Sequence, residues 1–307
     1  LHHLFYKWDF NDSSNLDNSS TGFAVGHVFR DPGTYSVACS AYDISGNIAT
    51  SSVSITVQDP DTVYAGSATV SISNGTTFTG AATGSIQVSS VNDLSTVVGY
   101  IERGVRVEDA RGDVFTTTDA TSFDISSQSG TALVTAFGTG DKPIFRLTTS
   151  TAVDMITHDG GDYFAMRDIR FESTGGAVGQ LACVKNYLHN EFASYVDCEA
   201  DGTCEGIVYQ TNTTEFFGDL PPTSIFVHRL IGANAGTSQA YYMGIGGIRH
   251  SYVGCTFPDI SGVGQTCHVM RFTGGNYFEI GGCTFGAAGD TFLHQLKGHA
   301  AVYATDA

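Results

Sequence analysis

The chain has 307 residues, of which 31 are acidic and 14 are basic, giving a formal net charge of −17. This acidic charge argues against a nucleic-acid partner, because binding phosphates requires a basic surface. No apolar run is long enough to span a membrane. With 37 glycines, 41% hydrophobic residues and only 15% charged residues, the composition is typical of a β-rich folded protein.

The first 59 residues predict a small antiparallel β-module. A short strand around Trp8, the only tryptophan, is followed by a polar loop and the turn 31–33. A strand over 34–43 and an alternating strand over 49–57 come next, separated by a Ser-Gly-Asn turn. Short strands bounded by such turns are typical of a β-sandwich.

This segment resembles a PKD domain, the immunoglobulin-like module of many secreted and cell-surface proteins. Residues 6–12 follow the family's YxWDFGDG strand, with Asn11 in place of the usual glycine, and residues 27–57 follow its HxFxxPGxYxV strand and the alternating strand beyond. The resemblance implies a β-sandwich that lacks its first two strands, with Trp8 buried against Tyr35 and Val37. It further implies an extracellular or cell-surface location. The missing strands are expected to come either from a longer parent protein or from a neighbour in a homo-assembly.

Residues 62–307 predict a solenoid. The fragments 252–257 and 280–285 both end in Cys-Thr-Phe and lie 28 residues apart (283 − 255), with earlier echoes at 166–171 and 195–198. Self-similarity at such a period is typical of stacked coils. Because Cys198, Cys255 and Cys283 occupy equivalent positions, we expect them to stack inward as free thiols. A disulfide framework is the alternative, and the pattern is expected to continue beyond residue 307.

The entry to this region resembles the right-handed parallel β-helix proteins of the pectate-lyase-like superfamily. Residues 97–104 and 133–144 match its Arg-Gly strand and its Gly-x-Gly-x-Lys-Pro turn. The resemblance implies an all-β chain, with a right-handed parallel β-helix after the sandwich. It implies no single chemistry, since that superfamily holds lyases, hydrolases, esterases, phage spikes and adhesins. The lyase segments Arg-x-Pro-x-x-Arg and Trp-Ile-Asp-His are missing from the sequence.

Basic residues recur on the strands after the Cys-Thr-Phe turns. Arg271 and Lys297 lie 26 residues apart and one position out of phase with apolar neighbours, which predicts a solvent-facing column. A lyase needs a cation beside the uronate carboxylate and a base for the C5 proton. The catalytic candidates are therefore Arg271, Lys297, His268 and His294, and the substrate-binding candidates are Arg249, His250 and Arg229. A solvated face with stacked histidines is the alternative.

An acidic cluster at Asp154, Asp159 and Asp162 could bind calcium, whose preferred ligands are carboxylate and carbonyl oxygens. It could equally be a glycosidase carboxylate pair or a polar turn. No other cofactor is implied.

These patterns predict an extracellular or surface protein directed at an acidic polysaccharide, by binding or as a lyase or hydrolase. The alternative is a non-catalytic structural or adhesive component of a filament, cell wall or phage spike.

Overall fold

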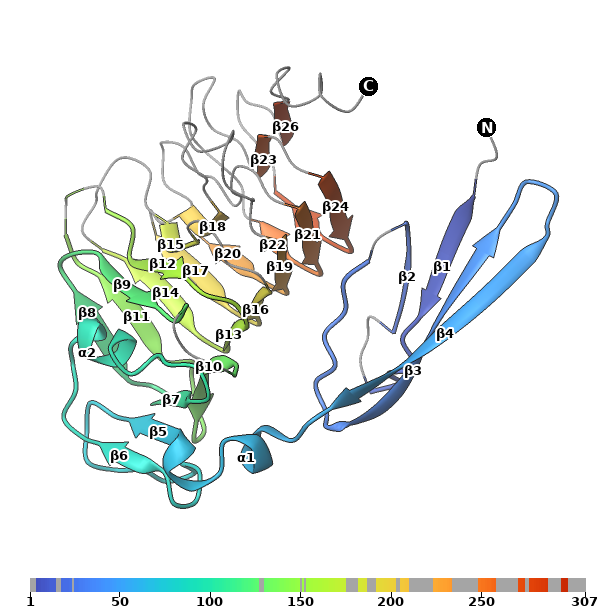
Figure 1. The fold of residues 1–307 in the computed structure, drawn as a ribbon. Coiled ribbons are helices and arrows are strands. Elements are labelled where there is room, and N and C mark those ends of the chain that lie inside the picture. The colour runs from blue at the N-terminus through green and yellow to red at the C-terminus, as the bar shows by residue number, and fades with distance from the viewer. Residues whose placement is uncertain are drawn as a thin grey trace.

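The computed structural model shows an antiparallel sheet followed by a parallel solenoid (Figure 1). It describes residues 4–14, 18–23, 25–126, 130–149, 151, 153–174, 182–186, 192–202, 205–209, 223–233, 248–257, 270–273, 276–286 and 294–297. Within these ranges, no helix has the length and apolar character needed to cross a bilayer.

The N-terminal sheet has four antiparallel strands in the order β2-β1-β3-β4. They are β1 (Phe5–Asp9), β2 (Ser19–Thr21), β3 (Gly33–Tyr42) and β4 (Ile48–Val57). The hairpin of β3 and β4 is closed by Asp43, whose carboxylate accepts the backbone N–H groups of Ser45 and Asn47. Among the described residues no second sheet packs on this one. The N-terminal module is therefore a single sheet, where a two-layered sandwich was expected.

One face of this sheet is apolar, because side chains alternate between the two faces of a strand. The register places Trp8 beside Cys39, and therefore on the same face as Val37 and Tyr35. Trp8 was expected to be buried against those two residues. It is only half-buried, and its indole N–H donates to the carbonyl of Gly22 at 2.9 Å.

Residues 25–30, here called the docking segment, lie between this apolar face and the solenoid (Figure 1). On the module side, the Phe29 ring packs on Tyr35 with centroids 4.3 Å apart. On the solenoid side, Gly26 lies so close to Phe226 that a Cβ on Gly26 would be 2.3 Å from its ring. Arg30 also forms a 2.5 Å ion pair with Asp197 of the solenoid. The solenoid thus lies where a sandwich would have its second sheet.

Glu279 of the solenoid strengthens this contact. Its carboxylate accepts hydrogen bonds from Ser20 Oγ at 3.2 Å, from Ser251 Oγ at 2.5 Å and from the backbone N–H of Gly26. Burial raises the pKa of Glu279, although these hydrogen bonds oppose the shift. A carboxylate from the solenoid is therefore used to hold the module.

The solenoid is a parallel β-helix built from three sheets, as expected. The first sheet has the order β24-β21-β19-β16-β13-β10-β7-β5-β6, the second β25-β22-β20-β17-β14-β11-β8 and the third β18-β15-β12-β9, and β23 pairs with β26. From β7 to β18, successive strands along the chain belong to successive sheets, so each coil adds one parallel strand to each of the three sheets.

The strands of the first sheet are β5 (Thr69–Ile72), β6 (Ile86–Val88), β7 (Arg106–Ala110), β10 (Ala132–Phe137), β13 (Phe164–Arg167), β16 (Ala193–Val196), β19 (Thr223–His228), β21 (Ile248–Val253) and β24 (Asn276–Gly281). Those of the second are β8 (Val114–Thr117), β11 (Ile144–Leu147), β14 (Arg170–Ser173), β17 (Glu199–Gly202), β20 (Ile231–Ala233), β22 (Thr256–Phe257) and β25 (Thr284–Phe285). The remaining strands are β9 (Thr121–Asp124), β12 (Ile156–Gly160), β15 (Ala182–Asn186), β18 (Glu205–Tyr209), β23 (Met270–Thr273) and β26 (His294–Lys297).

Three short helices connect the module to the solenoid and cover its first coil. Helix α1 (Pro60–Val63) begins at Asp59, whose side chain accepts the backbone N–H of Asp61, and η1 (Gly66–Ala68) leads into β5. Helix α2 (Leu94–Val98) buries Leu94, Val97 and Val98 against the core at the N-terminal end. This end of the apolar interior is therefore shielded from water.

The expected column of cysteines is confirmed. Cys198 and Cys255 are fully buried in line with Ile169 and Leu230, and Cys283 continues the column half-buried. In the described part of the chain these thiols are free. Burial raises the pKa of Cys198 to about 12, so its thiol is neutral and packs as a small apolar group.

A stack of phenylalanines fills the interior beside this column. Phe115, Phe145 and Phe171 follow one another with ring centroids 6.0 and 5.9 Å apart, and Phe257 and Phe285 stack at 5.3 Å. Burying one such side chain stabilises the fold by about 1.5–3 kcal/mol. The core of the solenoid is therefore a continuous apolar column from coil to coil.

Candidate anion-binding cleft

Charged residues line the corner between the first and second sheets. Asp168, Asp197 and Arg229 occupy this corner in successive coils, each with a left-handed backbone, at φ values of 65°, 54° and 53°. The backbone N–H of Asp197 donates to the carbonyl of His228, and that of Arg229 to Val253. The side chains of this corner therefore stack from coil to coil.

These corner charges are paired with one another. Asp197 accepts Arg229 Nε at 2.7 Å through one oxygen and Arg30 at 2.5 Å through the other. Asp168 accepts Arg111 from an earlier coil. Arg229, a predicted substrate-binding residue, thus shares the carboxylate of Asp197 with Arg30.

His250 lies inside the solenoid and does not reach a surface. It is only 2% exposed, and its register with Ile225 and Phe278 places it in the inward phase of the first sheet. Burial lowers its pKa to about 4, so the ring is neutral near pH 7. A ligand on the outer surface therefore cannot contact His250 as it lies here, contrary to the substrate-binding role predicted for it. Arg249 lies in β21, and its side chain is outside the described residues.

The basic column predicted at Arg271 and Lys297 has a different register from the expected one. The sequence suggested an offset of 26, whereas β23 and β26 pair Met270 with His294, an offset of 24 (294 − 270). Lys297 therefore lies opposite Thr273, and Arg271 opposite Gln295. The side chains of these strands, and residue His268, lie outside the described residues, so their catalytic role stays a prediction.

The three carboxylates proposed to bind calcium do not converge. Asp154 forms an ion pair with Lys185 at 2.7 Å, Asp162 lies 3.9 Å from Arg103, and Asp159 is exposed on β12. No group of three or more metal-ligating side chains occurs in the part of the chain that the structure describes. Calcium binding by this protein remains an untested expectation.

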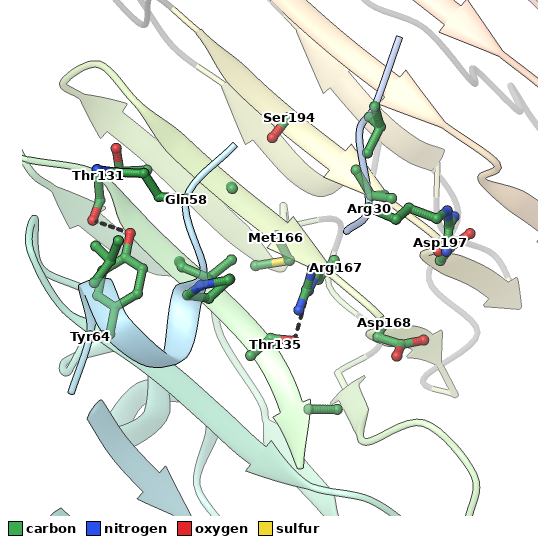
Figure 2. A pocket seen from close by; sticks show the side chains of 17 residues that line it. Arg30, Gln58, Tyr64, Thr131, Thr135, Met166, Arg167, Asp168, Ser194 and Asp197 are labelled. Carbon is green, nitrogen blue, oxygen red and sulfur yellow. Dashed lines mark hydrogen bonds and ion pairs between the residues drawn. The ribbon is translucent and has the colours of Figure 1, made fainter. Parts of the chain in front are cut away.

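A cleft of about 560 Å³ lies where the docking segment, the connecting helix and the first sheet meet (Figure 2). Val28 and Arg30 of the docking segment form one wall, and Gln58, Pro60 and Tyr64 form another. Its floor is the outer face of β10, β13 and β16, with the lining side chains Leu133, Thr135, Ala165, Arg167, Ser194 and Val196. The cleft thus depends on the module being docked.

Arg167 lines this cleft and forms no ion pair with the carboxylates that the structure describes. It ends β13 on the outward phase, is exposed, and donates only from Nε to Thr135 Oγ1 at 3.2 Å (Figure 2). Of the arginines whose side chains the structure describes, Arg167 alone has no carboxylate partner. Its remaining N–H donors form a planar fork that suits a carboxylate.

A second hollow of about 700 Å³ adjoins the first, and Arg167 and Thr135 line both. Its other charged lining residues are Asp61, Arg106, Glu108 and Arg111. Arg106 is paired with Asp61 at 2.6 Å, and Arg111 is paired with Asp168. Arg167 is therefore the arginine of this hollow that has no carboxylate partner among the described residues. Arg167 lies where the two hollows adjoin.

The cleft offers no general base among its described lining residues. Tyr64 donates its hydroxyl to the carbonyl of Thr131 at 3.0 Å, and burial raises its pKa. Asp168 and Asp197 are both held by arginines. The described geometry is therefore suited to holding an anion.

Sequence reasoning did not single out Arg167. It belongs to the repeat fragment 166–171, and strand alternation already places it opposite in phase to the buried Met166. Arg167 is distinctive only because the other arginines whose side chains the structure describes are paired with carboxylates, and the sequence does not show that pairing. That pairing depends on contacts between coils and on the docking of Arg30, which no local pattern encodes.

Comparison with known proteins assigns a family to the N-terminal segment. Residues 2–57 match the PKD domain family, which confirms the resemblance of the N-terminal segment. Among solved structures, an alginate lyase from Paenibacillus sp. str. FPU-7 is similar to this chain at 8% identity, with a TM-score of 0.27. The match covers 64% of this chain and 95% of the other. No curated protein matches the chain.

Proposed function

We propose that this protein binds an acidic polysaccharide outside the cell, in the cleft between its PKD module and the first sheet. The observation that carries the proposal is Arg167, an exposed guanidinium with no carboxylate partner, on the floor of the cleft and beside the adjoining hollow. In a chain with a net charge of −17, an unpaired cation at such a site favours a ligand that brings its own negative charge.

The chemistry of the lining supports a sugar acid. The Arg167 fork can hold a carboxylate in a bidentate manner, and the hydroxyls of Thr135 and Ser194 can hydrogen-bond to sugar hydroxyls. The two adjoining hollows, of about 560 and 700 Å³, offer room for more than one sugar unit. Because the described lining holds no free base, binding is the proposed activity, and elimination is not part of the proposal.

Binding of polygalacturonate, compared between the parent chain and Arg167→Ala, tests this proposal. The control is Arg146→Ala, which removes an equal charge from the second sheet, where Arg146 pairs with Glu172. Removing an exposed ion contact costs about 1 kcal/mol or less, roughly fivefold in Kd. We expect Arg167→Ala to weaken binding by that amount and Arg146→Ala to leave it unchanged.

Fully methyl-esterified polygalacturonate provides a second arm, because it keeps the sugar and removes the charge. It should bind weakly to the parent chain, and Arg167→Ala should change its affinity little. If the parent chain binds neither polymer at low salt, the proposal is refuted. Unsaturated uronate released during the same incubation, read by its absorbance, would show a lyase and contradict binding without catalysis.

A structural role is the second candidate, and a specific feature favours it. Ion pairs join successive coils along the second sheet, as between Arg146 and Glu172 and between Arg170 and Asp201. Such a ladder stiffens a rod without forming a ligand site. Binding of the charged polymer that depends on Arg167 decides between the two candidates.

A further inference from the structure

Asp197 is shared by two arginines at the corner that borders the cleft. Its Oδ2 lies 2.5 Å from Arg30 Nη2, and its Oδ1 lies 2.7 Å from Arg229 Nε. Arg229 Nη2 also donates to Oδ2 at 3.2 Å. Among the carboxylates that the structure describes, Asp197 alone forms an ion pair with either arginine. Two positive charges therefore share one negative charge, and this corner has an excess of positive charge.

The excess arises where the N-terminal module meets the solenoid. Elsewhere in the solenoid, charges alternate evenly. On the second sheet, two arginines alternate with two carboxylates, in the order Arg146, Glu172, Arg170 and Asp201. At the cleft, by contrast, the docking segment adds Arg30 to a carboxylate of the solenoid that already holds Arg229.

This excess of charge lies at the cleft. Arg30 and Asp197 both line it, together with Arg167 (Figure 2). The side chains of Arg30 and Arg229 are 34% and 33% exposed, so a dissolved ligand can approach them. Arg167 pairs in register with Val196, the residue directly before Asp197, and neighbouring strands lie about 4.8 Å apart. The cleft therefore has two cationic positions, one in each of two adjacent coils.

We propose that the Asp197 corner is a second anion subsite of the cleft, at which Arg30 binds a second carboxylate of the sugar chain held by Arg167. This inference rests on the proposed function and narrows the ligand to one with carboxylates on closely spaced sugar units, as in a polyuronate. A ligand carboxylate at the corner would balance the charges of Arg30 and Arg229. The guanidinium N–H groups that Asp197 does not use are donors that suit it.

Titrations of galacturonate and digalacturonate at low salt test this inference. Arg30→Gln removes one positive charge, and losing an exposed ion contact weakens binding by about fivefold or less. We expect that loss for digalacturonate. Galacturonate has one carboxylate, which the unpaired Arg167 binds in preference, so its affinity should stay as in the parent.

Asp197→Asn is the sharper variant, because it should tighten binding. It removes the carboxylate that competes with the ligand for Arg30 and Arg229. Asparagine also suits the left-handed backbone of this position, at φ 54°. We expect digalacturonate to bind this variant about fivefold more tightly than the parent. Asp201→Asn makes the same change on the second sheet, beside Arg170, and is the matched control that should bind as the parent does.

Gly26→Ala separates the loss of charge from a loosened module, because it disturbs docking and keeps Arg30. It should lower the affinity for both sugars alike. Equal losses for both sugars in Arg30→Gln would show that Arg30 only holds the module, and would overturn the subsite. Unchanged digalacturonate binding in Arg30→Gln, or weaker binding in Asp197→Asn, would also overturn it while leaving Arg167 as a binding residue. A parent chain that binds neither sugar would instead refute the proposed function, and this inference with it.

Discussion

Gly26 holds the N-terminal module against the solenoid, and replacing it with alanine should loosen that contact. A Cβ at this position would lie 2.3 Å from Phe226 Cε2 and 2.4 Å from Ser251 Oγ, so neighbouring atoms must move. The serine hydroxyl can rotate, but it already donates to Glu279. Overpacking of a close contact costs about 1–3 kcal/mol.

That cost falls on docking and leaves the fold of either part intact. Opening of the contact becomes easier by the same free energy, so a loss of about 2 kcal/mol raises amide exchange roughly thirtyfold. Hydrogen exchange followed by mass spectrometry should show this increase in residues 25–30 and in β21. The interior strands β11 and β14 should exchange as in the parent.

Gly33→Ala is the matched control for this experiment. A Cβ there would meet the Tyr35 ring no closer than 3.6 Å, an ordinary contact, within the same module. It should leave exchange in the docking segment unchanged. Equal protection of residues 25–30 in Gly26→Ala and Gly33→Ala would refute the reasoning, because the close approach of Gly26 would then have no energetic consequence.

Three further predictions concern the core, a buried acid and the basic strands. Phe171→Ala should lower the free energy of unfolding by about 3–5 kcal/mol in urea melts, and a loss under 1 kcal/mol would contradict its place in the stack. Asp109 is fully buried, and desolvation, aided by Asp113 and Glu108, raises its pKa, so the folded state keeps a proton that the unfolded state loses above about pH 4. Parent stability should therefore fall from pH 4 toward 7 relative to Asp109→Asn; a pH-independent difference would contradict this. Arg271→Ala with Lys297→Ala should weaken polygalacturonate binding at low salt if these strands extend the site, and unchanged affinity would remove them from it.

The solenoid could be predicted from the sequence because its signal is local and repeated. The Cys-Thr-Phe fragments fixed the inward column of Cys255 and Cys283, and strand alternation assigned the phenylalanines beside them. Register in the next strand could not be predicted the same way. The segment between Phe257 and β23 is longer than that between Phe285 and β26, so the offset changes from 28 to 24 within one coil (284 − 256; 294 − 270).

The site was harder to predict because it depends on contacts between distant segments. His250 follows an arginine, which suggested a basic surface, yet its phase within β21 turns it inward. Arg167 stands out only after Arg30 and Arg229 are found paired with Asp197. The single-layered module was likewise not foreseen, because the position of the solenoid beside its apolar face is a tertiary contact.

The most direct test of the proposed cleft is a crystal structure of the chain with a trigalacturonate oligosaccharide. We expect sugar density between the docking segment and β13, with one carboxylate within hydrogen-bonding distance of the Arg167 guanidinium, about 2.7–2.9 Å. An oligosaccharide bound elsewhere on the solenoid, or a cleft that stays empty while the ligand binds in solution, would contradict it.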